Sequence, residues 1–240
     1  MTKPRRSARW IALAVIGSLS IAALAIPAVR RVFHPVVVYA RGAHTVEQRV
    51  AEFTDARSRI RAHFDRAKVS FPPKRVVLLG LKDERRLIVY APDADDALRE
   101  IVVYPIRAAS GELGPKLREG DRQVPEGVYA LESLNPNSRF HVALRVAYPN
   151  QFDREMAAKD GRTNLGGDIM IHGGDASIGC LAMGDPAIEE LFVLAATVGI
   201  ENVTIILAPC DLRARELPPA LAGGPRSDLY LMIREELKKL

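Results

Sequence analysis

A histidine and a cysteine lie eight positions apart in a glycine-rich stretch of this 240-residue chain. The stretch reads IHGGDASIGCLAMGD from Ile171 to Asp185 and contains His172 and Cys180. A free thiol has a pKa of about 8.5, so it is only a few per cent ionised at neutral pH and needs a neighbouring base to act as a nucleophile. The two residues are therefore candidates for a nucleophile and its general base.

The residues around this pair favour a catalytic role. The run 168–171 is typical of a buried strand, and His172 falls at its end, which is a rigid place to hold a base. Gly179 permits backbone dihedrals that other residues avoid. The amides of Gly179 and Cys180 are thus candidates to donate hydrogen bonds to a substrate carbonyl oxygen that gains negative charge.

Three other interpretations of Cys180 remain open from these residues alone. A cysteine is often a small buried apolar residue. A zinc site usually needs four ligands, and the sequence has no Cys-x-x-Cys or His-x-x-x-His spacing. A disulfide with Cys210 would be possible in an oxidising compartment, although Cys210 is otherwise expected to be a structural thiol at a strand end. We expect no metal and no cofactor.

The N-terminus predicts export. Residues 10–29 form a run of 20 residues without a charge behind a basic cluster. As a helix this run would span about 30 Å, the hydrocarbon thickness of a bilayer. We expect a signal anchor with its basic end in the cytoplasm, and a signal peptide cleaved at Ala23-Leu24-Ala25 is the alternative. The remainder would lie in the cell envelope or periplasm, anchored in the inner membrane or secreted after cleavage.

The charge distribution excludes nucleic acid as a partner. The chain has 34 basic and 29 acidic residues. Six of the basic residues and no acidic residue fall within positions 1–31, which leaves 28 basic against 29 acidic residues in the body. A nucleic-acid-binding domain concentrates its basic residues on the folded part, so the overall excess belongs to the targeting segment.

Periodicity and turn residues predict a β-rich α+β domain. Residues 45–68 have helical spacing, and Phe71-Pro72-Pro73 ends that helix. Asp185 is expected to cap a helix that runs to about Val198, and residues 227–240 predict a closing helix. The expected strands and the two expected loops are, in order, strands 75–80, 87–90, 100–106, 127–132, 140–147, 168–172 and 202–208, and loops 109–125 and 134–139.

Motifs outside the pair add a resemblance. The His-Gly…Ser-x-Gly-Cys arrangement is accompanied by Gly114-Pro115-Lys116, Glu119-Gly120-Asp121 and Val124-Pro125-Glu126-Gly127-Val128-Tyr129. Together these resemble the L,D-transpeptidase catalytic domain (YkuD-type) family, the cysteine enzymes of bacterial peptidoglycan. Other segments are similar to its YafK-like subgroup: Phe71-Pro72-Pro73-Lys74, residues 81–87, residues 134–140 and Tyr148-Pro149-Asn150. The resemblance covers roughly residues 46–210.

The resemblance implies a β-sandwich with flanking helices and a cysteine acyl-enzyme. Cys180 would be the nucleophile, His172 the general base and Gly173 the residue whose carbonyl orients the histidine. Ser177 and Gly179 would shape the loop, and Ser177 is also a candidate to bind the substrate. The thiolate would attack the diamino-acid carbonyl of a peptidoglycan stem peptide, and the thioester would pass to an amine. The implied organisation is a basic tail and anchor at 1–31, a tether and helix at 32–70, the catalytic domain at 71–212, and a linker and helix at 213–240.

The sequence departs from the common form of the family. Ile178 stands where that form has a second histidine, Ala182 stands where it has an arginine, and the His-to-Cys interval is shorter. These departures match the YafK-like subgroup, for which hydrolysis that cuts a murein-linked protein or peptide is reported beside transfer. Hydrolysis of the thioester, a non-catalytic peptidoglycan-binding module and a structural zinc domain are the alternatives.

The weaker candidates precede the catalytic strand. Tyr148, Asn150, Arg154 and Arg162 are candidates to line the substrate groove, with ordinary loop and turn contacts as the equal alternative. His141 lies in an alternating strand, where a structural histidine is expected.

Overall fold

The structure is a computed structural model that describes residues 42–222 and 226–240. Residues 44–240 form one compact unit. The predicted anchor and most of the tether lie outside the described residues. Within the described ranges, none of the helices is long and apolar enough to cross a membrane.

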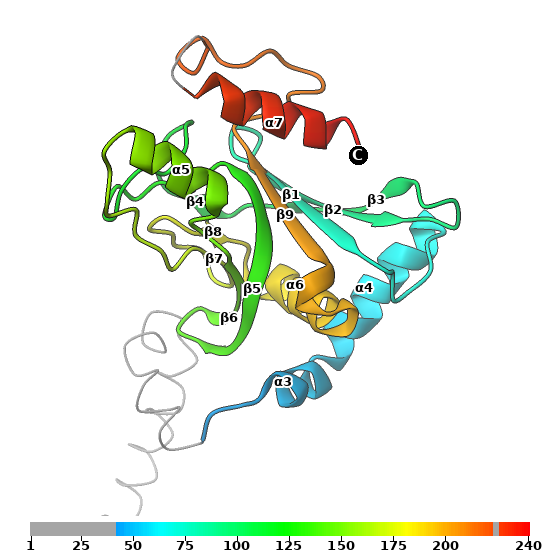
Figure 1. The fold of residues 1–240 in the computed structure, drawn as a ribbon. Coiled ribbons are helices and arrows are strands. Elements are labelled where there is room, and N and C mark those ends of the chain that lie inside the picture. Colours follow the sequence, from blue (N-terminus) through cyan, green and yellow to red (C-terminus); the bar gives the residue numbers. More distant parts are fainter. Residues whose placement is uncertain (1–41, 223–225) are drawn as a thin grey trace, which may run out of the picture. The chain divides into compact units, whose positions relative to one another are not determined.

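One nine-stranded sheet forms the centre of this unit (Figure 1). Its strand order is β3-β2-β1-β9-β5-β6-β7-β8-β4. The strands are β1 (Val76–Leu81), β2 (Arg86–Pro92), β3 (Leu98–Pro105), β4 (Ala108–Ala109), β5 (Gly127–Ser138), β6 (His141–Val146), β7 (Met170–His172), β8 (Leu181–Ala182) and β9 (Val203–Ala208). All seven predicted strands are therefore present, with shifted ends.

The long strand β5 joins the two halves of the sheet. Its residues 127–130 pair with β9, and its residues 131–138 pair with β6 across two register shifts. Hydrogen bonding therefore continues from one half to the other, and the strands form one continuous sheet where a β-sandwich was expected. The family expectation of a β-rich domain with flanking helices is otherwise met.

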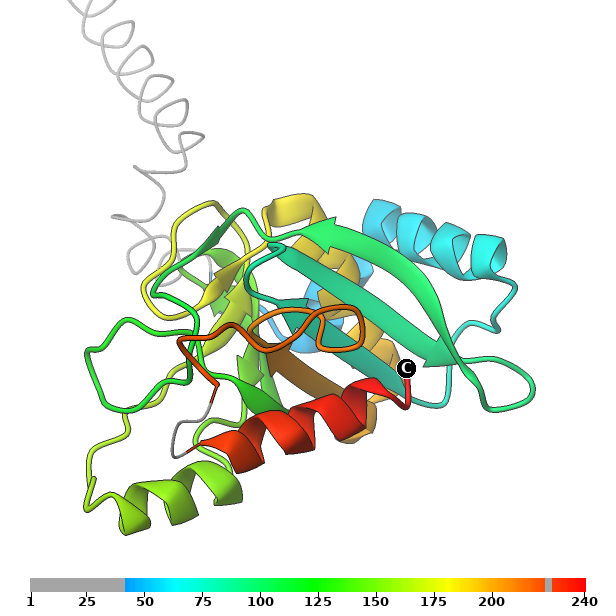
Figure 2. The same cartoon turned by 90° about the horizontal axis from the view of Figure 1, so that it is seen from above.

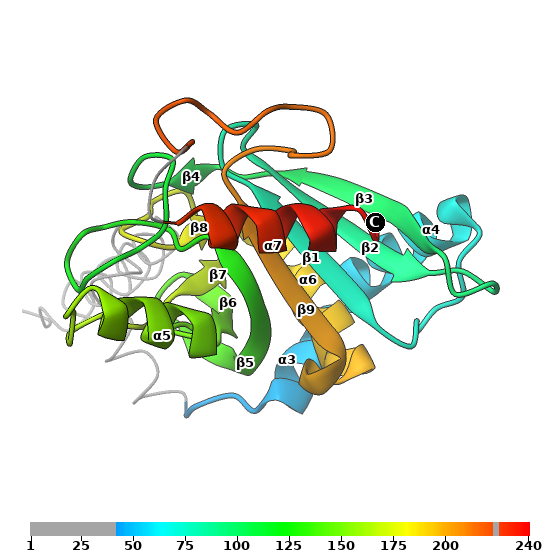
Figure 3. The same cartoon turned by 45° about the horizontal axis from the view of Figure 1, so that its top comes forward.

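Helices cover both faces of the β1, β2 and β9 region. α4 (Thr54–Ala67) and α6 (Asp185–Val198) share the larger apolar core with one face. α7 (Ser227–Leu237) packs on the other face through Leu229, Tyr230, Ile233 and Leu237. Figure 3 shows α7 lying across β9, and Figure 2 shows the same arrangement from above.

The predicted helix at 45–68 is two helices, α3 (Val46–Glu52) and α4. Phe53 between them has a non-helical backbone (φ −86°, ψ 49°). Its side chain is buried, with its ring edge-on to Phe192 at 6.3 Å between centroids. Burying this aromatic ring stabilises the break in the helix.

Three further sequence expectations are corrected. The segment 134–139 was expected as a loop, but β5 continues through it to Ser138, where the register shifts accommodate the Asn- and Pro-rich residues. α5 (Gln151–Lys159) was not predicted, although Asn150 and Asp153 form a capping box at its start. Asp185 is the first residue of α6, and the cap residue is Gly184.

Candidate active site

Strand pairing brings Cys180 and His172 to one place. β7 and β8 are parallel, with His172 opposite Ala182. Cys180 lies two residues before Ala182. Cys180 is a bend residue just outside β8, so this pairing sets the strand that ends at His172 beside the loop that carries Cys180.

His172 is buried, and its ring is held in one orientation. Its Nδ1 lies 2.7 Å from the carbonyl oxygen of Gly173. A carbonyl oxygen only accepts, so Nδ1 carries the proton and the neutral ring bears its lone pair on Nε2. The Phe140 ring lies 4.5 Å away between centroids, tilted by 31°. Nε2 is therefore the basic nitrogen of this imidazole.

Gly173 occupies a position where no side chain fits. A Cβ atom there would lie 2.5 Å from Asp185 Oδ1 and 2.6 Å from the Phe140 carbonyl oxygen. The neighbouring Gly174 amide donates to the same Asp185 oxygen at 2.9 Å. The close approach of these groups fixes the backbone that carries the carbonyl facing His172.

Cys180 is half-buried and has a free thiol, as does the buried Cys210. The disulfide interpretation is therefore not supported. Burial raises the pKa of the Cys180 thiol and the charge of Asp168 adds to this, while a backbone hydrogen bond from Met170 and the charge of Lys116 oppose it. A thiol with a raised pKa is mostly protonated near neutral pH, so its ionisation requires a base.

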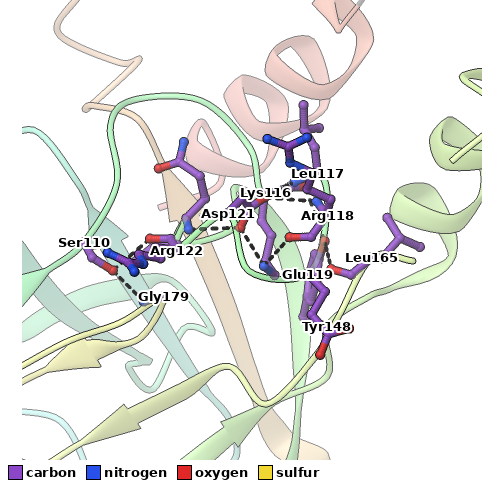
Figure 4. Close-up of polar contacts among 12 residues, drawn as sticks. Ser110, Lys116, Leu117, Arg118, Glu119, Asp121, Arg122, Tyr148, Leu165 and Gly179 are labelled. Carbon is purple, nitrogen blue, oxygen red and sulfur yellow. Dashed lines mark hydrogen bonds and ion pairs between the residues drawn. The ribbon is translucent and has the colours of Figure 1, made fainter. Parts of the chain in front are cut away.

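Two serine hydroxyls hold the loop that carries Cys180, and Figure 4 shows the first of them, Ser110, against Gly179. The Gly179 amide donates to Ser110 Oγ at 2.5 Å, and the Cys180 amide donates to Ser177 Oγ at 3.1 Å. Ser110 Oγ in turn donates to the Arg122 carbonyl oxygen at 2.8 Å. Both amides expected to stabilise an oxyanion thus have hydroxyl acceptors here. A substrate oxygen would have to replace those acceptors.

The four candidates before the catalytic strand have local partners. The Tyr148 side chain is buried, and its hydroxyl donates to the carbonyl oxygens of Lys116 and Leu165. Asn150 caps α5. Arg154 donates to the Pro149 carbonyl oxygen. Arg162 donates to the Leu117 carbonyl oxygen at 2.8 Å. These contacts are the turn and capping chemistry that the sequence left as the alternative.

Residues in the loop 110–122 lie nearer the site than those four. Ser110 and Arg122 reach the Gly179 loop, although about 60 residues separate them from it in the sequence. Lys116 is buried and close enough to influence the thiol electrostatically. Sequence spacing gave no signal for Ser110 or Arg122, whereas Lys116 belongs to a quoted family motif. Among the described residues, no group of three potential ligands is arranged to hold a metal ion.

Comparison with known proteins finds two similar curated proteins. The chain is 38% identical over 133 residues to a protein of Escherichia coli strain K12 named "Putative L,D-transpeptidase YafK", and the same holds for its counterpart in strain O157:H7. The match covers 53% of this chain and 51% of either relative. The chain therefore spans about half the length of the curated relatives it matches.

Two solved structures are also similar to this chain. The helical cell shape determining protein Pgp2 of Campylobacter jejuni is 26% identical, with a TM-score of 0.46 over 55% of this chain and 47% of Pgp2. Bd1075 of Bdellovibrio bacteriovorus is 22% identical, with a TM-score of 0.42 over 66% of this chain and 55% of Bd1075.

The family model of the YkuD L,D-transpeptidase catalytic domain matches residues 74–205. That span contains the His172 strand, the Cys180 loop and the segment with Lys116. Because it covers more than half of the 240 residues, the chain belongs to the YkuD L,D-transpeptidase catalytic domain family.

Proposed function

We propose that this chain is an exported cysteine acyl-transferase that acts on peptidoglycan stem peptides. The observation that carries the proposal is the pairing of β7 with β8, because β7 ends at His172 and β8 begins directly after Cys180, while His172 Nδ1 is bonded to the Gly173 carbonyl oxygen. Family membership supports the reaction class. The uncharged run 10–29 supports export and anchoring in the inner membrane.

In the first half-reaction, Nε2 of His172 takes the proton of the Cys180 thiol. The Sγ atom attacks the carbonyl carbon of the diamino acid, a C–S bond forms, and the carbonyl oxygen becomes an oxyanion. The Gly179 and Cys180 amides stabilise that oxygen once it replaces the serine hydroxyls as acceptor. The C–N bond then breaks, the leaving amine takes the proton from His172, and a thioester remains.

In the second half-reaction, an amine of a neighbouring stem peptide attacks the thioester. His172 takes the proton of that amine, the C–S bond breaks, and a new peptide bond links the two stems. Water in place of the amine would give hydrolysis. In that alternative, a murein-linked envelope protein is a further candidate substrate.

The Cys180→Ala variant tests the proposal. We expect it to lose all turnover of purified muropeptides, because the proposed reaction forms its thioester on the Cys180 sulfur and alanine has no nucleophile. Mass spectrometry of the products measures both the loss and the reaction type. New linked species identify transfer, and shortened species identify hydrolysis.

Cys210→Ala is the matched control, because it removes the other thiol of the chain. We expect it to keep turnover and to keep the thioester visible in the intact mass of the protein. Undiminished turnover in the Cys180→Ala variant would reject the proposed nucleophile. Binding to sacculi without any product from the unaltered chain would favour a non-catalytic module.

A further inference from the structure

A pocket of about 220 Å³ adjoins the Cys180 loop. It lies between the loop 116–122 and the segment 166–169, whose Asp168 carbonyl oxygen is 3.6 Å from Cys180 Sγ. Its lining includes charged residues of both signs and an isoleucine: Lys116, Glu119, Arg122, Asp168 and Ile178. Because Gly179 also lines it, the pocket is a direct neighbour of the nucleophile.

Two of these charges already have ionic partners. Lys116 Nζ lies 2.6 Å from Asp121 Oδ1 and donates to the Arg118 carbonyl oxygen at 2.8 Å. Asp168 Oδ1 lies 2.6 Å from Arg145 Nη1. These ion pairs belong to the walls of the pocket and leave little charge for a ligand.

The other two charges have no ionic partner among residues 42–222 and 226–240. The guanidinium of Arg122 makes no hydrogen bond or ion pair within these ranges. Its backbone is nevertheless fixed, because its carbonyl oxygen accepts from Ser110 Oγ. The Glu119 carboxylate accepts only from the neutral amide of Asn164, at 2.8 Å. Figure 4 shows Arg122 next to Ser110 and Gly179, with Glu119 further along the same loop.

Ile178 adds an apolar surface at the same place. Its side chain is 78% exposed, the more open of the two large hydrophobic side chains that are exposed in the described ranges. When a ligand covers a large apolar side chain that was exposed to water, the free energy of the complex falls. The pocket therefore offers one cation, one anion and an apolar contact.

We infer that this pocket binds the zwitterionic end of a diamino acid, in which one carbon carries both an ammonium and a carboxylate. Arg122 pairs with the carboxylate, Glu119 pairs with the ammonium, and Ile178 contacts the methylene chain that leads toward the reacting carbonyl. A group of a single charge would leave one of the two pocket charges unpaired. The inference rests on the proposed function, because it assigns the side chain of the same stem-peptide residue.

Charge-deleted substrates test this assignment with the full chain. The substrates are muropeptides with a free diamino-acid end, with its carboxylate amidated, or with its amine acetylated. We expect amidation to lower kcat/KM of the unaltered protein about 10- to 100-fold, as for loss of a charged hydrogen bond. The Arg122→Gln variant should show a similar loss on the free-acid substrate and little further loss on amidation. The Glu119→Gln variant should show a similar loss on the substrate with a free amine and little further loss when that amine is acetylated.

Arg118→Gln and Glu112→Gln are the matched controls, because both residues are exposed in the same loop and do not line this pocket. We expect both to keep the activity and the substrate preference of the unaltered chain. If Arg122→Gln retains the preference for the free carboxylate, the assignment is wrong. Inactivity of the unaltered chain on every muropeptide would instead reject the proposed function. In that case, calorimetric binding of the three muropeptides to the Cys180→Ala protein still decides the pocket's ligand.

The amine acceptor also carries a zwitterionic end, so the test must separate it from the acyl donor to which the pocket is assigned here. Thioester formation in the absence of an acceptor, measured by the intact mass of the protein, separates donor binding from acceptor binding. A slow acylation in Arg122→Gln places the donor in the pocket, and normal acylation with slow transfer places the acceptor there. If both steps proceed at the unaltered rate, the pocket does not bind this group.

Discussion

The chemistry proposed for this chain depends on one imidazole and how its proton is placed. The Gly173 carbonyl fixes the proton on Nδ1 of His172, so Nε2 is the atom that can accept a proton. The Cys180 thiol has a raised pKa because of its burial. The thiol therefore needs His172 to accept its proton, because its buried surroundings disfavour the thiolate.

Removing the imidazole should change how the reactivity of the Cys180 thiol depends on pH. In His172→Ala we expect alkylation by iodoacetamide near pH 7 to slow by about 10- to 100-fold, because burial raises the pKa of the Cys180 thiol and no base remains to take its proton. Reactivity should recover only at alkaline pH. Mass spectrometry of the alkylated peptide across pH 6–10 measures this profile. An unchanged rate at pH 7 would exclude His172 as the activating base.

The sequence predicted His172 and Cys180 because both lie within a short stretch whose glycines and strand pattern are local signals. Ser110 and Arg122 could not be found in this way, since the fold alone brings them to the Gly179 loop. Tyr148 shows the opposite case. Its motif made it a candidate for the substrate groove, but its side chain is buried and its hydroxyl donates to the Lys116 carbonyl oxygen.

At the scale of elements, apolar runs predicted the strands well and polar segments poorly. β1 and β9 are buried along almost their whole length, so their composition alone identifies them. The end of β5 reads LNPNS, and α5 begins directly after Tyr148-Pro149-Asn150; Asn and Pro are typical of turns. Pairing with β6 and a capping box decided their structure instead.

The C-terminal helix α7 supports the loop that lines the site. Tyr230 on α7 donates to Glu126 Oε2 at 2.9 Å. Glu126 is fully buried, and its other oxygen accepts from the Gly114 amide at 2.7 Å and lies 2.9 Å from Lys82 Nζ. This buried group thus joins α7, β1 and the start of the Lys116 segment.

Tyr230→Phe should destabilise the fold by about 1–3 kcal/mol, because it leaves a buried carboxylate oxygen without this donor. Urea unfolding followed by circular dichroism measures the change. Leu231→Ala is the control on the same helix, since Leu231 is 57% exposed, and we expect it to stay near the unaltered value. Equal stability of the Tyr230→Phe and unaltered proteins would show that Glu126 does not depend on α7.

At the scale of the whole molecule, one buried carboxyl links folding stability to pH. Burial raises the pKa of Asp153 from its ordinary 3.8 to about 6, although the Asn150 backbone and the Tyr129 hydroxyl oppose the rise. Between these two pH values, the folded chain retains a proton that the unfolded chain has lost. Stability therefore falls as pH rises through this window, by about 3 kcal/mol in total.

Asp153→Asn should remove this part of the pH dependence. An amide cannot ionise, and its oxygen can still accept from the Asn150 amide, which Asp153 Oδ2 does at 3.0 Å. The free energy of unfolding of the variant, relative to the unaltered chain, should therefore rise by about 2 kcal/mol between pH 4 and pH 7. Urea unfolding at both pH values measures this change. Asp95→Asn, in an exposed turn, is the control, and its free energy of unfolding relative to the unaltered chain should be the same at both pH values. If the Asp153→Asn difference is the same at pH 4 and pH 7, Asp153 ionises alike in the folded and unfolded chains. The pH response of the molecule would then have to come from other groups.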